Sequence, residues 1–325
     1  MRVLSAIQPT GAIHIGNYLG TIKQWIDLQE KNECIFFICD LHSITIPYDP
    51  KEFQKNILET AITYLAAGVN PEKSIFFVQS KVKEHTELCW LLGSVTPVGD
   101  LLRMTQYKEK SKQFKKNLDA GILNYPILMA ADILLYKSDA VPVGEDQAQH
   151  VELTRTIARK FNQRFGKTFN EPKTILPKMG ARIMSLTNPK KKMSKSMGPQ
   201  NYISLFDEPE EIEKKVMSAI TDSGKEIKYN PVKKPGISNL LVIYSLFSGK
   251  PIKELENFFN GKSYSFFKKS LSELLINSLE PFRRKRKELL LRETYIKETL
   301  NIGAKRAETI AQSTMEEVKS KMGLV

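Results

Sequence analysis

The feature that most constrains this chain is the alternation of short apolar runs with longer amphipathic segments over its first two-thirds. The short runs, at residues 3–7, 34–39, 74–79 and 140–143, are rich in β-branched or aromatic side chains. Helical spacing follows each of them, at residues 15–29, 51–67, 84–92 and 146–165. This order predicts an α/β fold, a Rossmann-like doubly wound parallel sheet whose ligand site lies at the carboxyl ends of the strands.

The remainder of the chain has a different texture. After about residue 189 strand-like runs disappear, and helical spacing recurs at residues 209–220, 237–247, 252–259 and 266–322. Pro281 interrupts the last run, so we expect a kink or break there. We therefore predict a catalytic domain over residues 1–188, a loop over 189–200 and an all-α domain over 201–325, with its last helices packing back on the catalytic domain.

Composition excludes several classes of protein. A chain of 325 residues with 41% hydrophobic side chains is globular and long enough for one to three domains. The three cysteines form no CxxC pair, which argues against a disulfide framework and a structural zinc site, and we expect no protein-bound metal centre. We expect neither a signal peptide nor a membrane span, and a cytoplasmic location.

The net charge of +13 is concentrated in the middle of the chain. Residues 101–200 hold 19 basic against 8 acidic side chains. An excess of this size suits a polyanion such as RNA or a nucleotide phosphate. A solvated basic surface is the other interpretation, and charge alone does not separate the two.

The first predicted strand leads into the sequence AIQPTGAIHIGNYLG at residues 6–20. Its small residues allow a phosphate-bearing ligand to approach the backbone, while the glycine spacing excludes both the dinucleotide fingerprint and the P-loop. His14 and Asn17 lie three residues apart, on one face of the first helical turn, and offer neutral donors to phosphate oxygens. A capped helix start with an ordinary histidine is the alternative interpretation.

A second basic motif stands at the predicted domain boundary. Residues 188–199 read NPKKKMSKSMGP, so several lysines share a loop bounded by proline and glycine. A loop in this position is placed to move, and its lysines can follow charge that develops on a splitting triphosphate. The alternative is a solvated basic linker.

These two motifs together resemble those of a known family. HIGN at residues 14–17 is similar to the first motif of class I aminoacyl-tRNA synthetases, and KMSKS at residues 192–196 matches the second. Further collinear stretches resemble the bacterial-type tryptophanyl-tRNA synthetase family over nearly the whole chain. These stretches are residues 6–20, CDLHSIT at 39–45, RMTQYKEKS at 103–111, YPILMAADILLY at 125–136, VPVGEDQAQHVELTR at 141–155, GARIMSL at 180–186 and KPGISNLL at 234–241.

The resemblance implies an ATP-dependent ligase. Such an enzyme converts L-tryptophan and ATP to tryptophanyl-adenylate and pyrophosphate, and then transfers tryptophan to the terminal ribose of tRNA(Trp). Catalysis is by positioning and charge stabilisation, for which it implies Asn17, Lys110, Lys192 and Lys195. The implied ATP contacts are Gln8, Pro9, Thr10, His14, Gly16 and Asn17 in the first loop, Gly144, Glu145 and Asp146 on the ribose side, Ile183 by the adenine, and Lys192, Met193, Ser194, Lys195 and Ser196 in the second motif. Mg²⁺ is expected to bind mainly through ATP and water.

The resemblance also implies a tryptophan pocket centred on Asp132. A buried carboxylate that accepts the indole N–H penalises substrates that lack this donor, and the apolar residues around Asp132 favour burial over a place on a helix surface. The other implied pocket residues are Tyr125 and Gln147 for the α-amino group, Met129, Val141 and Val143 as apolar walls, and His42. Two departures stand out: Asn17 replaces the last histidine of the class motif, and Leu4 stands where many relatives have phenylalanine.

Three alternatives remain at this point. Tyrosyl-tRNA synthetases share the fold and the class motifs, but LMAAD and GEDQAQH follow the tryptophan pattern. A nucleotidyltransferase with a HIGH-type motif is expected to be shorter and to lack the KMSKS loop. A synthetase-like RNA-binding protein without activity is disfavoured by the intact Lys192, Lys195 and Asp132. The resemblance further implies anticodon recognition by the helical domain and a homodimer.

Overall fold

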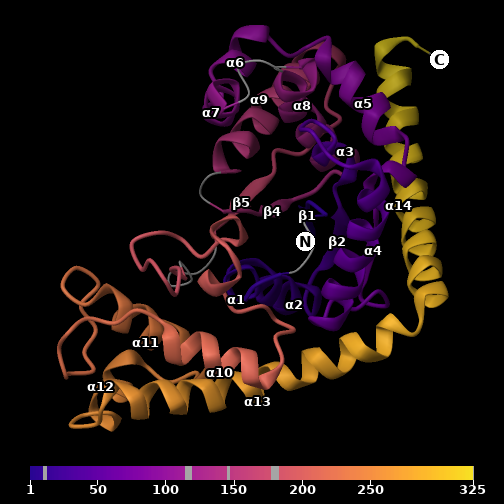
Figure 1. Ribbon diagram of the computed structural model, residues 1–325. Helices are drawn as coiled ribbons and strands as arrows, with labels where there is room; N and C mark the ends of the chain where they lie inside the picture. Colours follow the sequence, from indigo (N-terminus) through magenta and orange to yellow (C-terminus); the bar gives the residue numbers. More distant parts are fainter. Residues whose placement is uncertain (10–12, 114–118, 145–146, 177–182, 325) are drawn as a thin grey trace.

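The computed structural model, drawn in Figure 1, describes residues 1–9, 13–113, 119–144, 147–176 and 183–324. Five parallel strands form one sheet in the order β3-β2-β1-β4-β5. The strands are β1 (Arg2–Ile7), β2 (Glu33–Ile38), β3 (Ser74–Val78), β4 (Ala140–Pro142) and β5 (Lys173–Ile175). The predicted Rossmann-like sheet is confirmed, and β5 is an edge strand that the sequence patterns did not predict.

Alternating side chains along the strands explain why both faces of the sheet are covered. Val3 and Phe36 join one hydrophobic cluster, while Leu4 and Phe37 join the other. The helices α2 (Lys23–Gln29) and α4 (Pro50–Ala66) pack in the first cluster, where Trp25 stacks on Phe36 at 4.4 Å between ring centroids. The helices α5 (Glu84–Gly93), α8 (Ala120–Leu135) and α9 (Ala148–Phe165) pack in the second.

The strand order reverses between β1 and β4, and this reversal positions the site. Connections from β1 and β4 leave the sheet in opposite directions, so a crevice opens beyond their carboxyl ends. The HIGN segment follows β1, and the VPVGEDQ segment follows β4. Both predicted ligand-binding segments therefore start at the topological switch point.

Five α-helices follow residue 189, where the sequence predicted only helical spacing, and they are α10 (Pro209–Ser218), α11 (Pro235–Ser248), α12 (Ile252–Phe258), α13 (Tyr264–Leu290) and α14 (Glu293–Met322). Shorter helical elements lie earlier in the chain, namely α1 (Ile15–Asn17), a π-helical stretch (Tyr18–Ile22), α3 (Asp40–Ser43), α6 (Val98–Leu102) and α7 (Thr105–Gln113). The helix predicted over residues 15–29 is thus one helical segment with a π-helical stretch inside it.

Of the kink or break predicted at Pro281, the structure contradicts the break. Helix α13 continues through Pro281, and the chain turns after Leu290 instead. Buried Arg283 donates from Nη2 to the carbonyl oxygen of Ile276 at 2.8 Å, so a side chain serves a backbone acceptor in the turn before the proline. Packing of α13 against α10, α11 and α4 holds the rest of the helix in place.

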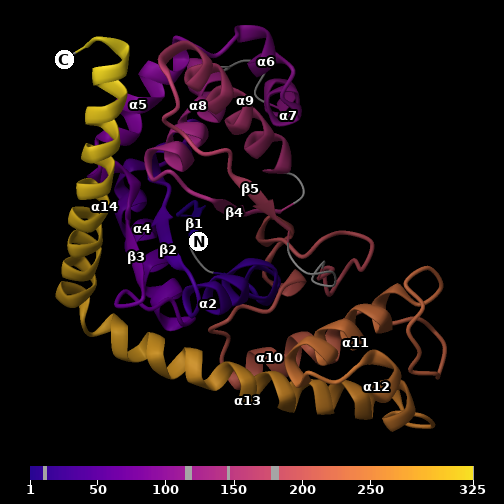
Figure 2. The same cartoon turned by 180° about the vertical axis from the view of Figure 1, so that it is seen from behind.

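Helix α14 lies along the outer edge of the sheet, beside β3, α4 and α5 (Figures 1 and 2). Its approach to the strand depends on Gly303, since a Cβ there would lie 2.0 Å from the carbonyl oxygen of Phe76. Arg306 on the next turn donates from Nη1 to the carbonyl oxygens of Pro71 and Ser74, at 3.1 and 3.4 Å. The helix therefore covers the edge strand and hydrogen-bonds to backbone beside it.

The helices α10, α11 and α12 gather at the end of the molecule away from α5 to α9, and α13 runs from them toward the sheet (Figure 1). Arg286 on α13 forms an ion pair with Glu59 on α4, with Nη2 and Oε2 2.8 Å apart. Within the part of the chain that the structure describes, no helix is both long and apolar enough to cross a membrane.

Candidate active site

His14 begins the helix that follows β1. Its Nδ1 accepts the backbone N–H of Asn17 at 3.3 Å, and the side chain of Asn17 accepts the backbone N–H of His14 at the same distance. This reciprocal capping box fixes the histidine ring at the helix start. The helix start is therefore capped as one interpretation predicted, but the ring is buried and is not an ordinary surface histidine. The cap uses Nδ1 and not Nε2.

Gly16 makes room for that ring. A Cβ at this position would lie 3.0 Å from Cε1 and Nδ1 of His14. Burial, followed by the positive charges of Lys195 and Lys192, lowers the pKa of His14 to about 4. The imidazole is therefore neutral at pH 7, and because Nδ1 accepts a hydrogen bond, the proton resides on Nε2. In this state Nε2 carries an N–H donor, and its predicted bond to a phosphate oxygen stays a prediction.

The KMSKS segment lies close enough to the HIGN segment for its lysine charges to act on His14. Backbone bonds dock the chain that follows KMSKS onto the first motif, since Ile15 N donates to Ile203 O and Leu205 N donates to Ile13 O, both at 3.0 Å. Burial lowers the pKa of Lys195, whereas Lys192 is exposed. The structure thus brings the two predicted phosphate-binding motifs together.

A short backbone pairing supports the KMSKS segment from the other side. Met193 N donates to Ile183 O at 2.9 Å, and both side chains are buried in one cluster. The side chain of Asn239 on α11 hydrogen-bonds to both backbone groups of the neighbouring Met184. Its Oδ1 accepts from Met184 N at 2.8 Å, and its Nδ2 donates to Met184 O at 2.9 Å. A helix beyond the KMSKS segment therefore holds the strand-like segment on which KMSKS rests.

Asp132 lies inside α8 and is 3% exposed, which excludes a place on the helix surface. Its Oδ2 lies 2.7 Å from Nε2 of His42, and its Oδ1 lies 2.7 Å from Nε2 of Gln79 and 2.6 Å from Nδ1 of His85. Burial raises the pKa of this carboxyl, but the charges and hydrogen bonds of His42 and His85 outweigh it and lower the pKa to about 2. The carboxylate is therefore ionised and acts only as an acceptor.

The predicted apolar walls belong to one hydrophobic cluster, on the face of the sheet that α8 covers. Leu4 and Val141 are buried on neighbouring strands, and Met129 and Val143 pack against the same hydrophobic cluster. Leu4 fits this cluster as an aliphatic side chain. Their contact with tryptophan stays a prediction.

Tyr125 lies on α8, one turn before Met129, with its ring edge toward His42 at 6.2 Å between centroids. Its hydroxyl donates to Oε1 of Gln106 at 2.8 Å, and it also lies 2.8 Å from Nε2 of His150. Gln147 stands at the start of α9, where its backbone N–H donates to Gly144 O at 3.0 Å. The two residues predicted to hold the α-amino group therefore start from facing helices.

The other predicted residues fall as follows. Gln8 is exposed and Pro9 buried just beyond β1, and Gly144 is exposed beyond β4. Ser194 precedes a 3₁₀ turn that contains Lys195 and Ser196, and Lys110 lies in α7. Thr10, Glu145 and Asp146 lie outside the described residues.

Sequence patterns missed Gln79, His85, Tyr136 and His150. Gln79 directly follows β3, so a polar residue at the carboxyl end of a strand was the available signal. His85 and His150 carried a different signal, because the chain has only four histidines and all four are buried. Buried histidines require hydrogen-bond partners, which here are Asp132, Tyr136 and Tyr125.

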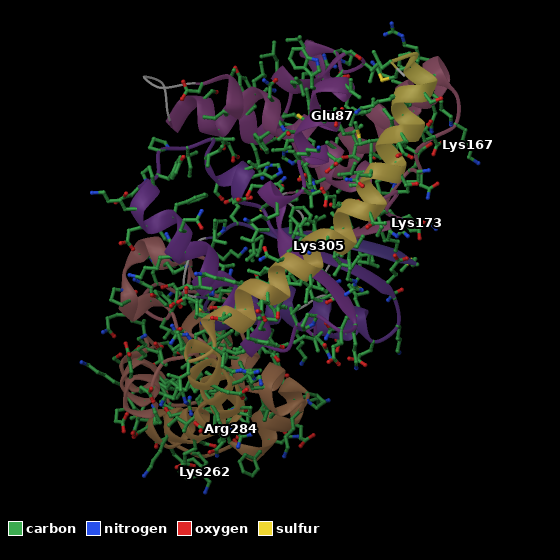
Figure 3. All side chains as sticks on the ribbon, turned by 90° about the vertical axis from the view of Figure 1, so that its right-hand side faces the viewer. Glu87, Lys167, Lys173, Lys262, Arg284 and Lys305 are labelled. Carbon is green, nitrogen blue, oxygen red and sulfur yellow. The ribbon has the colours of Figure 1, made fainter. Side chains whose placement is uncertain are left out.

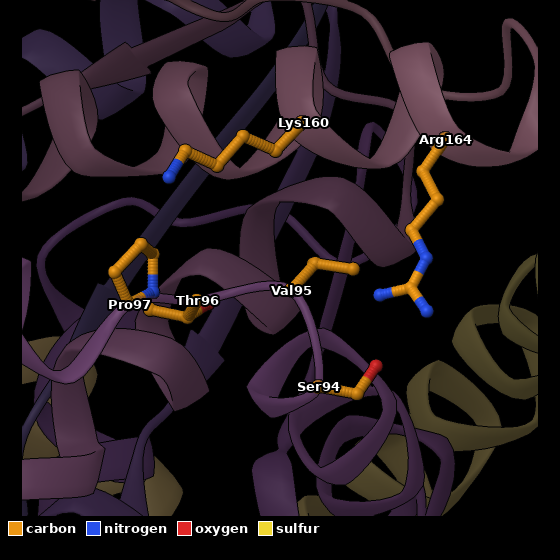
Figure 4. Close-up of a pocket in the computed structure, with 6 residues that line it drawn as sticks. All are labelled: Ser94, Val95, Thr96, Pro97, Lys160 and Arg164. Atoms are coloured by element: carbon orange, nitrogen blue, oxygen red, sulfur yellow. The ribbon is translucent and has the colours of Figure 1, made fainter.

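A separate hollow of about 310 Å³ lies between α9 and the loop after α5. Lys160 and Arg164 reach from α9 over the loop (Figure 4), whose residues Ser94, Val95, Thr96 and Pro97 complete the lining. None of the predicted site residues lines it.

Comparisons with known proteins match this geometry. The family described as tRNA synthetases class I (W and Y) matches residues 1–280. A tryptophan–tRNA ligase of Caldanaerobacter subterraneus is 52% identical over the whole chain and 98% of its own length. The crystal structure of tryptophanyl-tRNA synthetase from Mycoplasma pneumoniae has a TM-score of 0.88 at 36% identity, with 100% of this chain and 98% of that chain covered. That of Campylobacter jejuni, complexed with ADP and tryptophan, has a TM-score of 0.87 at 39% identity, with both chains covered fully.

The chain therefore belongs to the class I aminoacyl-tRNA synthetases of the tryptophan and tyrosine group. Within this class it is one of the bacterial-type tryptophan–tRNA ligases, because its relatives carry that name at about half identity over their full length. The tyrosyl alternative and the shorter nucleotidyltransferase are both disfavoured by these full-length matches.

Proposed function

We propose that the chain charges tRNA(Trp) with tryptophan in two steps at the β1/β4 crevice. In the first step a carboxylate oxygen of L-tryptophan attacks the α-phosphorus of ATP, and the bond to the bridging oxygen of pyrophosphate breaks. In the second step a hydroxyl of the terminal ribose attacks the adenylate carbonyl and releases AMP. The relatives' names and the ligands of the Campylobacter structure support these substrates.

On the phosphate side, the chain supplies donors and cations rather than a nucleophile. His14 is a neutral donor, and Lys192 and Lys195 lie close enough for their positive charges to act on it. We assign these groups to the triphosphate, with Lys195 following the charge that moves onto pyrophosphate. Asn17 holds His14 in position through the capping box.

A magnesium ion that accompanies ATP fits this arrangement. In the described ranges, no three His, Cys, Asp or Glu side chains gather as they would to hold a metal. Mg²⁺ also prefers to keep water and phosphate ligands. We therefore assign its ligands mainly to the phosphate oxygens and water, so that protein cations and the metal ion share the phosphate charge.

On the tryptophan side, Asp132 is the acceptor for the indole N–H. It is ionised, buried and surrounded by apolar walls, so an unpaired donor or acceptor in this pocket carries its full desolvation cost. A phenol presents its polar group farther along the ring axis than an indole nitrogen does. We therefore infer that the pocket selects tryptophan over tyrosine.

The observation that carries the proposal is the joining of the HIGN and KMSKS segments around a neutral His14 at the switch point. Its test is exchange of labelled pyrophosphate into ATP by the purified protein with each of the twenty amino acids. We expect exchange only with tryptophan, since adenylate formation requires the amino acid carboxylate. Equal exchange with tyrosine contradicts the proposal, and no exchange at all would favour the inactive RNA-binding alternative.

For tRNA, we propose that the helical part over residues 201–325 binds the anticodon end. Phe258 and Phe266 are 62% and 50% exposed, and both rings contact buried Phe259. Lys250 Nζ lies 5.7 Å from the Phe258 ring centre, and Lys262 Nζ lies 5.4 Å from that of Phe266. Lys262 projects at the far end of the molecule from the C-terminal part of α14 (Figure 3). Aromatic rings beside lysines suit unpaired bases and their phosphates.

We also propose a cytoplasmic homodimer. Helices α5 and α6 expose Trp90 and Val98 by 83% and 61%. A second copy of the chain would cover them. Light scattering on the wild type and on Trp90→Glu tests this, and a monomeric wild type at micromolar concentration contradicts it.

A further inference from the structure

We propose that His85, aided by Gln79 and Tyr136, is a positioning residue for tryptophan selection. It fixes the Asp132 carboxylate so that one acceptor position, on Oδ2, faces the substrate. The inference rests on the proposed role of Asp132 in binding the indole N–H, and it concerns how the protein prepares that acceptor.

The argument starts from the acceptor capacity of the carboxylate. Its two oxygens offer about four acceptor positions in total. Gln79 and His85 both approach Oδ1, at 2.7 and 2.6 Å, and so use both of its positions. His42 uses one position of Oδ2, at 2.7 Å. One position, on the oxygen shared with His42, is left for a ligand.

The direction of each hydrogen bond follows from the ionised state of Asp132. An ionised carboxylate only accepts, so Nδ1 of His85 donates to Oδ1. The Tyr136 hydroxyl lies 2.8 Å from Nε2 of the same ring, and burial raises its pKa well above the ordinary value. Tyr136 therefore keeps its proton, and its hydrogen bond to Nε2 holds the His85 ring with Nδ1 toward Asp132.

Gln79 is oriented by the same rule. Turning its amide over would set Oε1 against the negative Oδ1, so the NH₂ group faces Asp132. Oε1 is buried and has no hydrogen-bond partner among the described residues. The protein tolerates this unsatisfied acceptor in order to place a second donor on Oδ1, which is a cost expected at a functional site.

Packing prevents the assembly from rearranging. The His85 ring is fully buried and lies 5.4 Å from the ring of Phe37 and 6.0 Å from that of Phe77, on two adjacent strands. Tyr136, also fully buried, closes the other side at 5.4 Å. With Oδ1 held by two donors on fixed supports, the carboxylate cannot exchange its oxygens. A ligand without an N–H therefore leaves the open position of Oδ2 unfilled.

The test compares tryptophan with 3-benzothienyl-L-alanine, which has a sulfur in place of the indole N–H. The readout is the ratio of kcat/KM for the two amino acids in pyrophosphate exchange. His85→Leu removes the donor, and we expect its ratio to fall about tenfold from that of the wild type, through a raised KM for tryptophan. His85→Asn restores a donor near the place of Nδ1 and should recover most of the ratio.

Two further variants keep the test decisive. Tyr136→Phe keeps the volume but removes the hydroxyl that holds the His85 ring in place, so the ratio should fall here too, even if His85→Leu does not fold. Phe161→Leu is the control, because this buried ring lies in the same hydrophobic cluster but contacts the rings of Phe165 and Phe169, and its ratio should equal that of the wild type. Equal losses for both amino acids in His85→Leu, or an unchanged ratio in Tyr136→Phe, overturn the inference. A wild type that does not exchange with tryptophan counts against the proposed function instead.

Discussion

We predict that Gly16→Ala displaces the His14 ring, and so slows the reaction with ATP, while the free energy of unfolding stays nearly unchanged. The new Cβ would lie 3.0 Å from Cε1 and Nδ1 of His14, against 3.4–4 Å for an ordinary contact, so the ring must move by about 0.4 Å. The bond from Asn17 N to His14 Nδ1 is already 3.3 Å long, and a shift of this size away from Asn17 takes it beyond hydrogen-bonding distance. The substitution therefore displaces the donor that we assign to the ATP phosphates.

The size of the effect can be worked out for both properties. Alanine in a helix gains about 0.5–1 kcal/mol over glycine, and loss of the cap costs about 1 kcal/mol. The free energy of unfolding of Gly16→Ala should therefore be nearly unchanged. Because small misplacements of catalytic groups are costly, kcat/KM for ATP should fall about tenfold to a hundredfold.

Gly20→Ala is the matched control. Gly20 lies four residues later in the same helical segment, and its added Cβ would have nothing within 4 Å. Urea unfolding should show this variant as stable as the wild type or more so, and pyrophosphate exchange at saturating tryptophan should show unchanged ATP kinetics. If Gly16→Ala exchanges pyrophosphate as well as Gly20→Ala does, Gly16 is not the residue that makes room for His14.

Three other perturbations have defined outcomes. Lys195→Ala should lower kcat for exchange with little change in ATP binding, because its charge acts on the developing pyrophosphate; a change in KM alone would indicate uniform binding. Asp132 has a pKa of about 2 against an ordinary value of 3.8, so the ionised carboxylate adds about 2 kcal/mol to the free energy of unfolding above pH 4. This contribution is lost as the pH falls toward 2. Urea unfolding of wild type and Asp132→Asn should therefore converge from pH 5 to pH 3, and a constant difference contradicts this. Gly303→Ala should destabilise the fold by about 1–3 kcal/mol, since its Cβ meets Phe76 O at 2.0 Å, while exposed Ile302→Ala should change little.

The parts of the fold that apolar runs encode were predictable. Strands β1 to β4 stand out because they are buried on both faces, whereas β5 has only Lys173, Thr174 and Ile175, which are exposed or half-buried. Its strand character comes from pairing with β4 and from Val143 N donating to Ile175 O at 3.1 Å. The break expected at Pro281 is absent because packing of α13 against α10, α11 and α4 outweighs the local helix-breaking effect of proline.

The candidate site shows the same division. His14, Asn17, Lys192, Lys195 and Asp132 were found through linear motifs, and the structure groups the first four and buries the fifth. The donors that hold Asp132 come from segments 47 to 90 residues away, so no local pattern could join them to it. Only the parallel order of β2 and β3, whose carboxyl ends meet beside α8, brings them into contact.

The cover that α14 provides for β3 has a consequence for biosynthesis. The ribosome makes β3 long before it makes Gly303 and Arg306, so a nascent chain carries an open, apolar strand edge until the last long helix emerges. Premature termination before α14 would leave that edge permanently exposed. Such fragments should aggregate by adding strands to that open edge, so a released chain should resist aggregation only when it contains α14.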